Sequence, residues 1–212
     1  MSVTAQRALS MDKAASIRVN GDGVYTNLPI GGAYRGYGAP QAFFPLESLM
    51  DEAAETMGID PIELRLKNVF KVGDDIPIAK ILGEGREGFP MVLYSTEIEA
   101  CLKEGRKLSD WERLRSEPGS GRYRRGIGVA VAGQGSGIPG IDMGAAFIKM
   151  NEDASFNLQV GATDLGTGSD TALAQIAAEG LGVSVEKIIV YSSDTDMTPF
   201  DTGAYASSTT YI

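Results

Sequence analysis

The sequence of 212 residues predicts an α+β fold in which helices pack on a mixed β-sheet. Apolar residues recur at helical spacing through much of the first half, whereas short runs of β-prone residues dominate the second half. The 27 glycines exceed the usual share of about 7% and indicate tight turns and close backbone approaches between the elements. A chain of this length can bury a core without disulfides or structural metals.

The first expected elements are a strand, a loop and a long helix. The strand covers residues 17–29, and a glycine-rich loop at 31–41 follows it. Between residues 40 and 57 the apolar side chains fall on one face of a helix, and Gly58 supplies the residue type that ends helices in the left-handed conformation.

A second helix is expected to begin at Asp60. Asp60 is a good N-cap, Pro61 suits the first helical position, and Glu63 completes the spacing of a capping box. This helix is expected to run to about Phe70. Residues 71–90 are rich in turn formers and are expected to be irregular.

A third helix is expected at residues 96–108, and a basic segment follows it. From residue 105 to 125 there are seven basic and three acidic side chains, which leaves a local charge of +4. A nucleic-acid patch is one interpretation, but the mixture of Ser, Gly and Pro favours a solvated linker at 111–125. The residues before it, 1–110, form the first expected segment.

The second expected segment covers residues 126–212. A buried strand is expected at 125–133, and a hairpin is expected from strands at 145–150 and 155–160 that a four-residue turn joins. Alternation along these strands is imperfect, so which face is buried stays open.

The rest of the second segment alternates helix and strand. A glycine turn leads into a helix at residues 172–180, and a strand follows at 187–191. The tail from 194 to 212 is polar and rich in turn formers, and it predicts that the chain is truncated at its C-terminus relative to a longer protein.

Two absences restrict the chemistry. There is no histidine, and Cys101 is the one cysteine, so this sequence supplies no Ser-His-Asp triad, no imidazole-ligated zinc and no internal disulfide. The formal charge of −9 argues against nucleic acid as a partner. Neither a signal peptide nor a run of about 18 apolar residues is present, so we expect no membrane partner and a cytoplasmic location.

Both glycine loops precede helices and form the main chemical signals. In residues 165–171 the backbone N–H groups could hold an anion such as phosphate, although a simple turn with Ser169 or Asp170 as N-cap is the alternative. In residues 31–41 Arg35 lies between tyrosines and glycines. Such an arginine suits bidentate contact with a phosphate, a carboxylate or a pterin carbonyl, and the alternative is a pair with a local acid.

Five segments together resemble one family, the molybdopterin-binding (large) subunit of xanthine dehydrogenases and aldehyde oxidases. The segments are YTNLP at 25–29, GAYRGYGAPQ at 32–41, DPIELRLKN at 60–68, TDLGTG at 163–168, and DTD with TGAYASS at 194–208. The resemblance covers nearly the whole chain and implies a partial molybdopterin-binding domain. It points most closely to bacterial purine hydroxylases.

The resemblance also implies a function. In that family a molybdenum–molybdopterin cofactor hydroxylates a carbon beside a ring nitrogen, or an aldehyde carbon, with oxygen derived from water. A purine such as hypoxanthine or xanthine, or a related N-heterocycle, is the implied substrate. Iron–sulfur clusters and FAD are expected on other domains or subunits of an oligomeric enzyme. The alternative is a binding or assembly module of the same fold that does no chemistry.

The resemblance assigns roles to single residues. Those implied to bind the cofactor are Arg35, Gly36, Gly166, Thr167, Gly168 and Ala204, and those implied to bind substrate are Tyr37 and Arg7. Thr167 replaces a glutamine of the animal enzymes, and Gly36 replaces a cysteine of carbon monoxide-oxidising relatives. The family holds its metal through the cofactor sulfurs, so no side-chain metal ligand is assigned. Its basic glutamate has no match here, so no catalytic residue is assigned, and we expect the chain alone to be inactive.

Overall fold

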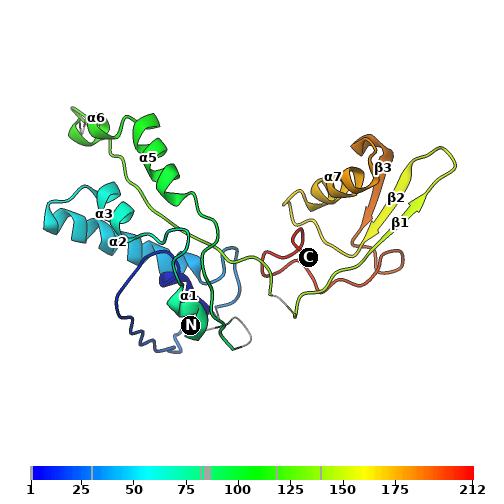
Figure 1. Ribbon diagram of the computed structural model, residues 1–212, viewed down its shortest axis with the longest axis horizontal. Coiled ribbons are helices and arrows are strands. Elements are labelled where there is room, and N and C mark those ends of the chain that lie inside the picture. The colour runs from blue at the N-terminus through cyan, green and yellow to red at the C-terminus, as the bar shows by residue number, and fades with distance from the viewer. Residues whose placement is uncertain (1, 30, 82, 84–86, 118, 139) are drawn as a thin grey trace. The chain divides into compact units, whose positions relative to one another are not determined.

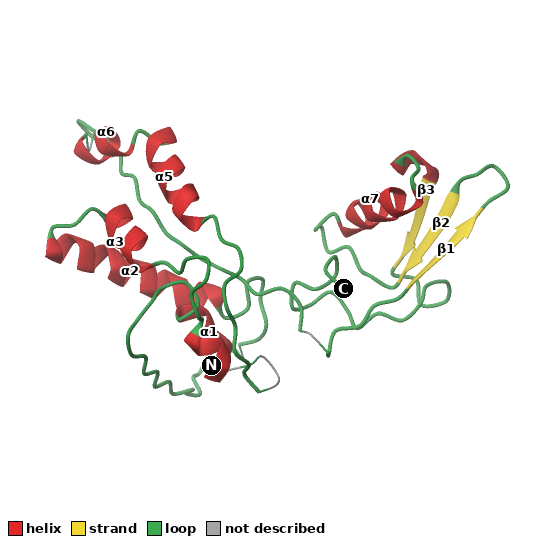
Figure 2. Ribbon diagram, in the orientation of Figure 1, coloured by secondary structure: helices red, strands yellow, loops and turns green. Residues whose placement is uncertain are grey.

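The computed structural model describes residues 2–29, 31–81, 83, 87–117, 119–138 and 140–212 (Figures 1 and 2). The chain divides into two compact units, residues 1–134 and residues 135–212, which are described here one at a time. Helices dominate the first unit, and the second contains a mixed sheet with a helix, which confirms the α+β prediction. None of the described helices has the length and apolar content that crossing a bilayer requires.

The first unit contains six described helices. They are α1 (Ser2–Ala8), α2 (Ala39–Met57), α3 (Pro61–Asn68), α4 (Pro77–Ile81), α5 (Ile98–Leu108) and α6 (Trp111–Ser116). The three long helices predicted from spacing are therefore confirmed as α2, α3 and α5. Glycines in the left-handed region cap both ends of α2, with φ of 81° at Gly38 and 65° at Gly58.

The start of α3 uses the side chain that the sequence predicts. The Asp60 carboxylate accepts hydrogen bonds from the backbone N–H groups of Ile62 at 2.9 Å and Glu63 at 3.3 Å. Glu63 does not complete the capping box, because its carboxylate pairs with Arg106 of α5. The other Asp60 oxygen accepts from Trp111 Nε1 at 2.8 Å, so one carboxylate joins α3 to α6.

A buried ion pair lies inside the first unit. Arg65 of α3 is 1% exposed and donates from Nε to Glu47 Oε2 of α2 at 2.7 Å. Its other nitrogens donate to the carbonyl oxygens of Pro61 and Glu47, both at 3.1 Å. The same Glu47 oxygen accepts from the backbone N–H of Val131 at 2.9 Å. The pair thus holds α2, α3 and the segment at 126–133 together.

Two predicted strands are absent among the described residues. Residues 17–29 form no ladder, and Tyr25 is fully exposed while Val24 is 79% exposed. Residues 125–133 contain no assigned strand, although Val131 is buried in the core formed with Ile62, Val69, Leu102 and Trp111. In both places the β-prone sequence lacks the second strand that a ladder requires.

The expected linker at 111–125 also differs from the structure. Its first part is helix α6, and Trp111 is only 2% exposed because its ring packs in the core of the first unit. The two units divide after Gln134 instead. Pro118 of the expected linker, and residues 82 and 84–86 of the expected irregular stretch, lie outside the described residues.

The second unit contains a three-stranded sheet. Its elements are β1 (Ala146–Met150), β2 (Phe156–Val160), α7 (Ser169–Leu181), a short 3-10 helix η1 (Val185–Lys187) and β3 (Ile188–Ser192). The strand order is β1-β2-β3, with β1 antiparallel to β2 and β3 parallel to β2. The predicted hairpin, helix and final strand are all confirmed.

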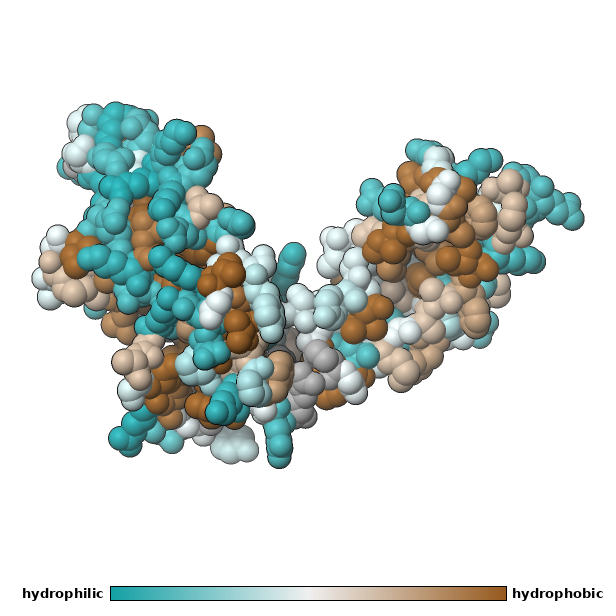
Figure 3. Space-filling model, in the orientation of Figure 1, coloured by the Kyte–Doolittle hydropathy of each residue, from teal (hydrophilic) through white to brown (hydrophobic). Residues whose placement is uncertain are grey.

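Helix α7 covers one face of β2 and β3. Leu158 and Val160 of β2, with Ile188 of β3, form a buried cluster with Ala174 and Ala178 of α7. This arrangement answers the question of which face is buried. All five residues of β1 stay exposed, and hydrophobic side chains are visible on the surface of this unit (Figure 3).

Candidate functional site

The glycine-rich loop at 31–41 lines a cavity of about 300 Å³ in the first unit. Arg35 and Tyr37 both border it, together with Tyr34 and Gln41 of the same segment. The opposite wall comes from Val3 and Thr4 of α1, so a helix far away in sequence closes the cavity. The structure therefore brings two of the predicted site residues, Arg35 and Tyr37, to one place.

Local backbone geometry shapes this loop. The N–H of Tyr37 donates to the Tyr34 carbonyl at 2.8 Å, and Gly36 takes a φ of 86° that side-chain-bearing residues rarely adopt. At Gly38 a Cβ would lie 2.9 Å from Cγ1 of Val3, so glycine is required for α1 to approach. The glycines therefore serve both the turn and the closure of the cavity.

The side chains of the loop are open to a ligand. Among the described residues Arg35 forms no ion pair with a local acid, which is the alternative interpretation of this arginine, and the residue is exposed. Tyr37 is 49% exposed, so it is not a core residue. Arg7 is only 9% exposed within α1 and does not line the cavity.

The two candidate loops of the second unit leave the same edge of the sheet. Because β2 and β3 are parallel, their carboxyl ends lie side by side, and the segments that follow Val160 and Ser192 begin there. Ser193 Oγ donates to the Ala162 carbonyl at 3.1 Å. A Cβ at Gly161 would lie 2.4 Å from the Pro199 carbonyl oxygen, so these segments are in close contact.

In the loop after β2 the backbone N–H groups bind a carboxylate of the chain itself. Asp164 Oδ1 accepts from the N–H groups of Gly166 and Thr167, both at 2.8 Å, and Gly168 at 3.1 Å. The Asp170 N–H reaches Oδ2 at 3.5 Å. Desolvation works to raise the pKa of Asp164, but these backbone donors outweigh it and the pKa is lowered. The expected phosphate-type contact to these donors is thus replaced by Asp164, and Gly168 is the N-cap in place of Ser169 or Asp170.

Two polar atoms beside this loop are buried without a hydrogen-bond partner among the described residues. They are Ser169 Oγ, in a residue 2% exposed, and Asp170 Oδ1. The other Asp170 oxygen accepts from Ser192 Oγ of β3 at 3.0 Å. Buried polar atoms are nearly always paired in proteins, so the start of α7 suits a polar ligand. This observation fits the kind of cofactor that the sequence implies.

The segment around Ala204 is strained. Ala206 and Ser207 take φ of 51° and 55°, in the left-handed region, although neither is glycine. The Ala206 carbonyl accepts from the Gly137 N–H at 2.9 Å, which helps to hold the strained turn. Backbone strain of this kind concentrates at functional sites.

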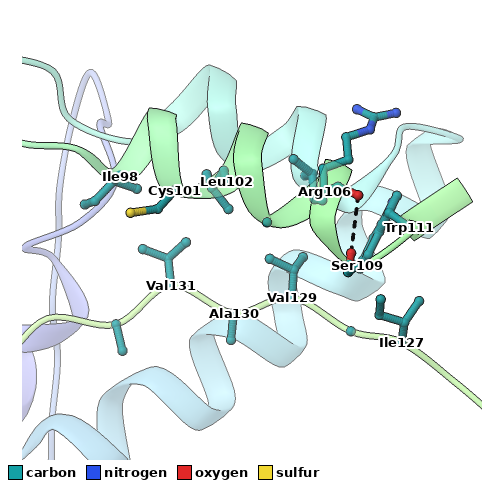
Figure 4. Close-up of a pocket in the computed structure, with 14 residues that line it drawn as sticks. Ile98, Cys101, Leu102, Arg106, Ser109, Trp111, Ile127, Val129, Ala130 and Val131 are labelled. Carbon is teal, nitrogen blue, oxygen red and sulfur yellow. Dashed lines mark hydrogen bonds between the residues drawn. The ribbon is translucent and has the colours of Figure 1, made fainter.

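Other features of the described residues were not assigned by sequence. No group of three or more His, Cys, Asp or Glu side chains able to hold a metal occurs among them. A larger cavity of about 440 Å³ lies between α5 and residues 127–132, with Leu102 and Val129 on its facing walls (Figure 4). Its lining is mainly apolar, and Cys101 borders it.

Sequence reasoning missed Val3, Thr4 and Asp164. The sequence does contain a signal for the hydrogen bonds of Asp164. An aspartate two residues before a Gly-x-Gly turn commonly accepts hydrogen bonds from the N–H groups that follow it. Val3 and Thr4 reach the cavity only through the packing of α1, which no local pattern indicates.

Two family matches agree with this geometry. Residues 104–212 match a family described as "Molybdopterin cofactor-binding domain", and residues 1–69 match a second family with the same description. The first match includes the loops of the second unit, and the second includes the Arg35 loop.

Known relatives show the same likeness. The chain is 44% identical over 193 residues to the xanthine dehydrogenase molybdenum-binding subunit of Escherichia coli O157:H7, and this covers 89% of the chain and 24% of the relative. It is 38% identical to the "Probable hypoxanthine oxidase XdhD" of Escherichia coli K12, covering 88% and 19%. The aldehyde oxidoreductase structure from Desulfovibrio desulfuricans matches with a TM-score of 0.72 and 30% identity, covering 94% and 21%.

The chain thus spans about a fifth to a quarter of the length of these relatives. Over that span the matched segments include every loop that the sequence singles out, and one match covers more than half of the chain. The buried unpaired atoms at the start of α7 and the cavity at Arg35 suit a polar cofactor. The chain belongs to the molybdopterin cofactor-binding domain family.

Proposed function

We propose that this chain forms part of the molybdopterin site of a molybdenum hydroxylase that oxidises a purine or a related N-heterocycle, such as hypoxanthine or xanthine. The observation that carries the proposal is the cavity lined by Arg35 and Tyr37, in the loop that contains the family-like segment GAYRGYGAPQ. Two of the relatives are named for xanthine and hypoxanthine, which supports a purine over an aldehyde.

In this proposal the bound cofactor supplies hydroxylation of an electron-poor carbon with oxygen that derives from water. Arg35 and Gly36 hold the edge of the cofactor, since a guanidinium offers five donors in a fixed plane and glycine permits close backbone approach. Tyr37 offers a ring face against which a flat heterocycle stacks. Arg7, buried within α1, is the second residue proposed to bind substrate.

The second unit, taken by itself, also offers residues that would bind the cofactor. Gly166, Thr167 and Gly168 present a surface without bulky side chains, and the Ser169 hydroxyl is a buried donor without a described partner. Ala204, two residues before the strained turn at Ala206 and Ser207, would also bind the cofactor. Iron–sulfur clusters and FAD would be bound by other domains or subunits of a cytoplasmic, oligomeric enzyme.

A non-catalytic binding or assembly module is the second candidate. The observations that favour it are the apolar cavity beside α5 and the exposed strand β1, both of which suit burial against a partner subunit. Such a module would need no cofactor for its role.

Substrate assays of the full-length protein that carries this chain distinguish these candidates. The protein is purified with its partner subunits and given hypoxanthine, nicotinate or an aldehyde with an artificial electron acceptor, in water enriched in oxygen-18. The proposal predicts turnover of hypoxanthine with label in the product. Turnover of aldehydes alone would overturn the purine assignment, and a stable complex without molybdenum or pterin would favour the assembly module.

A further inference from the structure

We propose that Asp164 is a positioning residue of the second cofactor loop, and that its carboxylate takes the place that an anionic group of the ligand would otherwise fill. The inference rests on the proposed function, because it concerns how this loop meets the cofactor. The spacing of the glycines in this loop does not by itself indicate such a role for Asp164.

Backbone donors converge on one oxygen of the Asp164 carboxylate. Three consecutive N–H groups, those of Gly166, Thr167 and Gly168, point at one oxygen of Asp164 within 3.1 Å. The Thr167 hydroxyl also lies 3.5 Å from that oxygen. Successive N–H groups that converge in this way form an anion-binding concavity. The concavity is filled by a group from the chain itself.

The conformation of the loop depends on this arrangement. Gly166 and Gly168 take φ of 88° and 77°, and these values turn the N–H groups inward. Without a central anion the converging N–H dipoles would repel one another, and the loop would open. Gly168 also begins the 13-residue helix α7, whose N-terminal N–H groups carry partial positive charge. The carboxylate therefore stabilises both the turn and the start of the helix.

The surroundings of Asp164 favour its charged form. Its lowered pKa reflects the backbone donors, which outweigh desolvation. Asp170, the nearest other carboxylate in sequence, donates its own N–H to Asp164 Oδ2, while its Oδ2 atom accepts from Ser192. Asp164 is thus ionised at neutral pH.

The bound carboxylate restricts how this loop can contact a ligand. A tethered carboxylate is present at high local concentration, so a phosphate of the ligand cannot readily displace it. The loop must therefore contact the cofactor with its glycine surface and the Ser169 hydroxyl, because its N–H groups are already bound. Asp164 shapes the loop without touching the ligand.

The first experiment tests the ring of donors in the 212-residue chain by NMR. The backbone amide signals of Gly166, Thr167 and Gly168 are followed during titration with acetate and with inorganic phosphate, in the unaltered chain and in Asp164→Ala. We expect no response in the unaltered chain. In Asp164→Ala the three signals should move to lower frequency and then return towards their original positions as acetate is added.

A matched control comes from the turn between β1 and β2. Asp153 likewise accepts from a backbone N–H, that of Ser155 at 3.0 Å, but faces no ring of donors. Asp153→Ala should leave the loop signals unchanged and should create no anion response there. Loop signals that ignore Asp164→Ala, or that titrate with phosphate in the unaltered chain, would overturn the inference.

The second experiment measures cofactor content in the full-length protein. Asp164→Ala should lower pterin and molybdenum content several-fold, Asp164→Asn should retain more because it keeps one acceptor oxygen, and acetate added during assembly should partly restore Asp164→Ala. Unchanged content in Asp164→Ala would refute the positioning role. If the unaltered protein carries no pterin, the proposed function fails instead, and the NMR experiment still decides the role of Asp164 in the loop.

Discussion

The guanidinium of Arg65 donates from Nε to the Glu47 carboxylate at 2.7 Å, with only 1% and 8% of the two side chains exposed. Glu47 lies on α2, which begins at the end of the Arg35 loop, and Arg65 lies on α3, which packs against α2. The pair also holds the backbone of Val131 through the second bond to Glu47. Arg65 also pairs with the half-exposed Asp51 at 2.8 Å, so its contact with Glu47 is the desolvated part of a small charge network in the first unit.

Removing one partner of the Arg65–Glu47 pair should lower the free energy of unfolding of the first unit. Arg65→Met leaves the Glu47 carboxylate buried without its counter-charge, and we expect a loss of about 3–5 kcal/mol in the free energy of unfolding. The double variant Glu47→Gln with Arg65→Met removes the buried charge and should recover part of this loss. Urea unfolding followed by the fluorescence of Trp111, the one tryptophan of the sequence, measures the first unit. Equal losses in both variants would contradict an electrostatic origin.

Asp12 should destabilise the first unit at neutral pH. Burial, followed by the charge of Glu47, raises its pKa, and Arg65 opposes them only in part. When the pKa of a carboxyl is raised in the folded state, the protein loses stability as pH rises from the unfolded-state pKa of about 3.9 to the raised folded-state pKa. Asp12→Asn should therefore raise the Tm at pH 7, and this gain should vanish below about pH 4. The exposed Asp22→Asn is the control; an equal gain there would rule out this explanation.

The stability that Asp60 contributes should depend on pH in the opposite direction from that of Asp12. Desolvation works to raise its pKa, but the Trp111 indole and the N–H groups of Glu63 and Ile62 outweigh it, so the pKa is lowered. The stability it contributes is present above its unfolded pKa and is lost as pH falls through the folded value. Asp60→Ala should cost about 1 kcal/mol or more at pH 7, and less in acid, whereas Asp60→Asn should keep most of the cap. The measurement is the Tm of the unaltered protein, Asp60→Ala and Asp60→Asn from pH 7 to pH 3. A Tm difference between the unaltered protein and Asp60→Ala that does not change with pH would contradict this prediction.

The long elements could be predicted because their signals are local. The helical spacing from Phe43 to Met57, the cap at Asp60 and the turn between β1 and β2 each depend on neighbouring residues. The prediction of a strand at 17–29 was wrong because a strand depends on a non-local partner. Its β-prone residues cannot form a ladder without a partner, and partner choice is not encoded locally.

The candidate site was predicted in part for the same reason. The family-like segments located the Arg35 loop and the loops after β2 and β3, and the parallel pairing of these strands explains why the latter two leave one edge. The contribution of α1 to the cavity could not be seen, because Val3 meets Gly38 only after the helices pack. The same holds for the buried pair of Glu47 with Arg65, which are 18 residues apart.

Tyr37 should affect substrate affinity without affecting stability. Its ring borders the Arg35 cavity and is 49% exposed, so little core packing depends on it. In the full-length enzyme Tyr37→Ala should weaken binding of a flat aromatic substrate by about 1–3 kcal/mol, with an unchanged Tm. Tyr94→Ala, at an exposed tyrosine outside this cavity, is the control for aromatic loss. A lower Tm with unchanged KM would show that Tyr37 is a packing residue.

The most direct test is the molybdenum and pterin content of the full-length protein with Gly36→Val. Gly36 has a φ of 86°, and a Cβ there would lie 3.2 Å from Cδ of Pro40, so valine distorts the Arg35 loop. Gly73→Val is the matched control, because Gly73 has a φ of 91° and open space around it. Elemental analysis and pterin fluorescence should show strong loss in Gly36→Val and near-normal content in Gly73→Val. Full cofactor content and turnover in Gly36→Val would contradict the assignment of this loop to the cofactor.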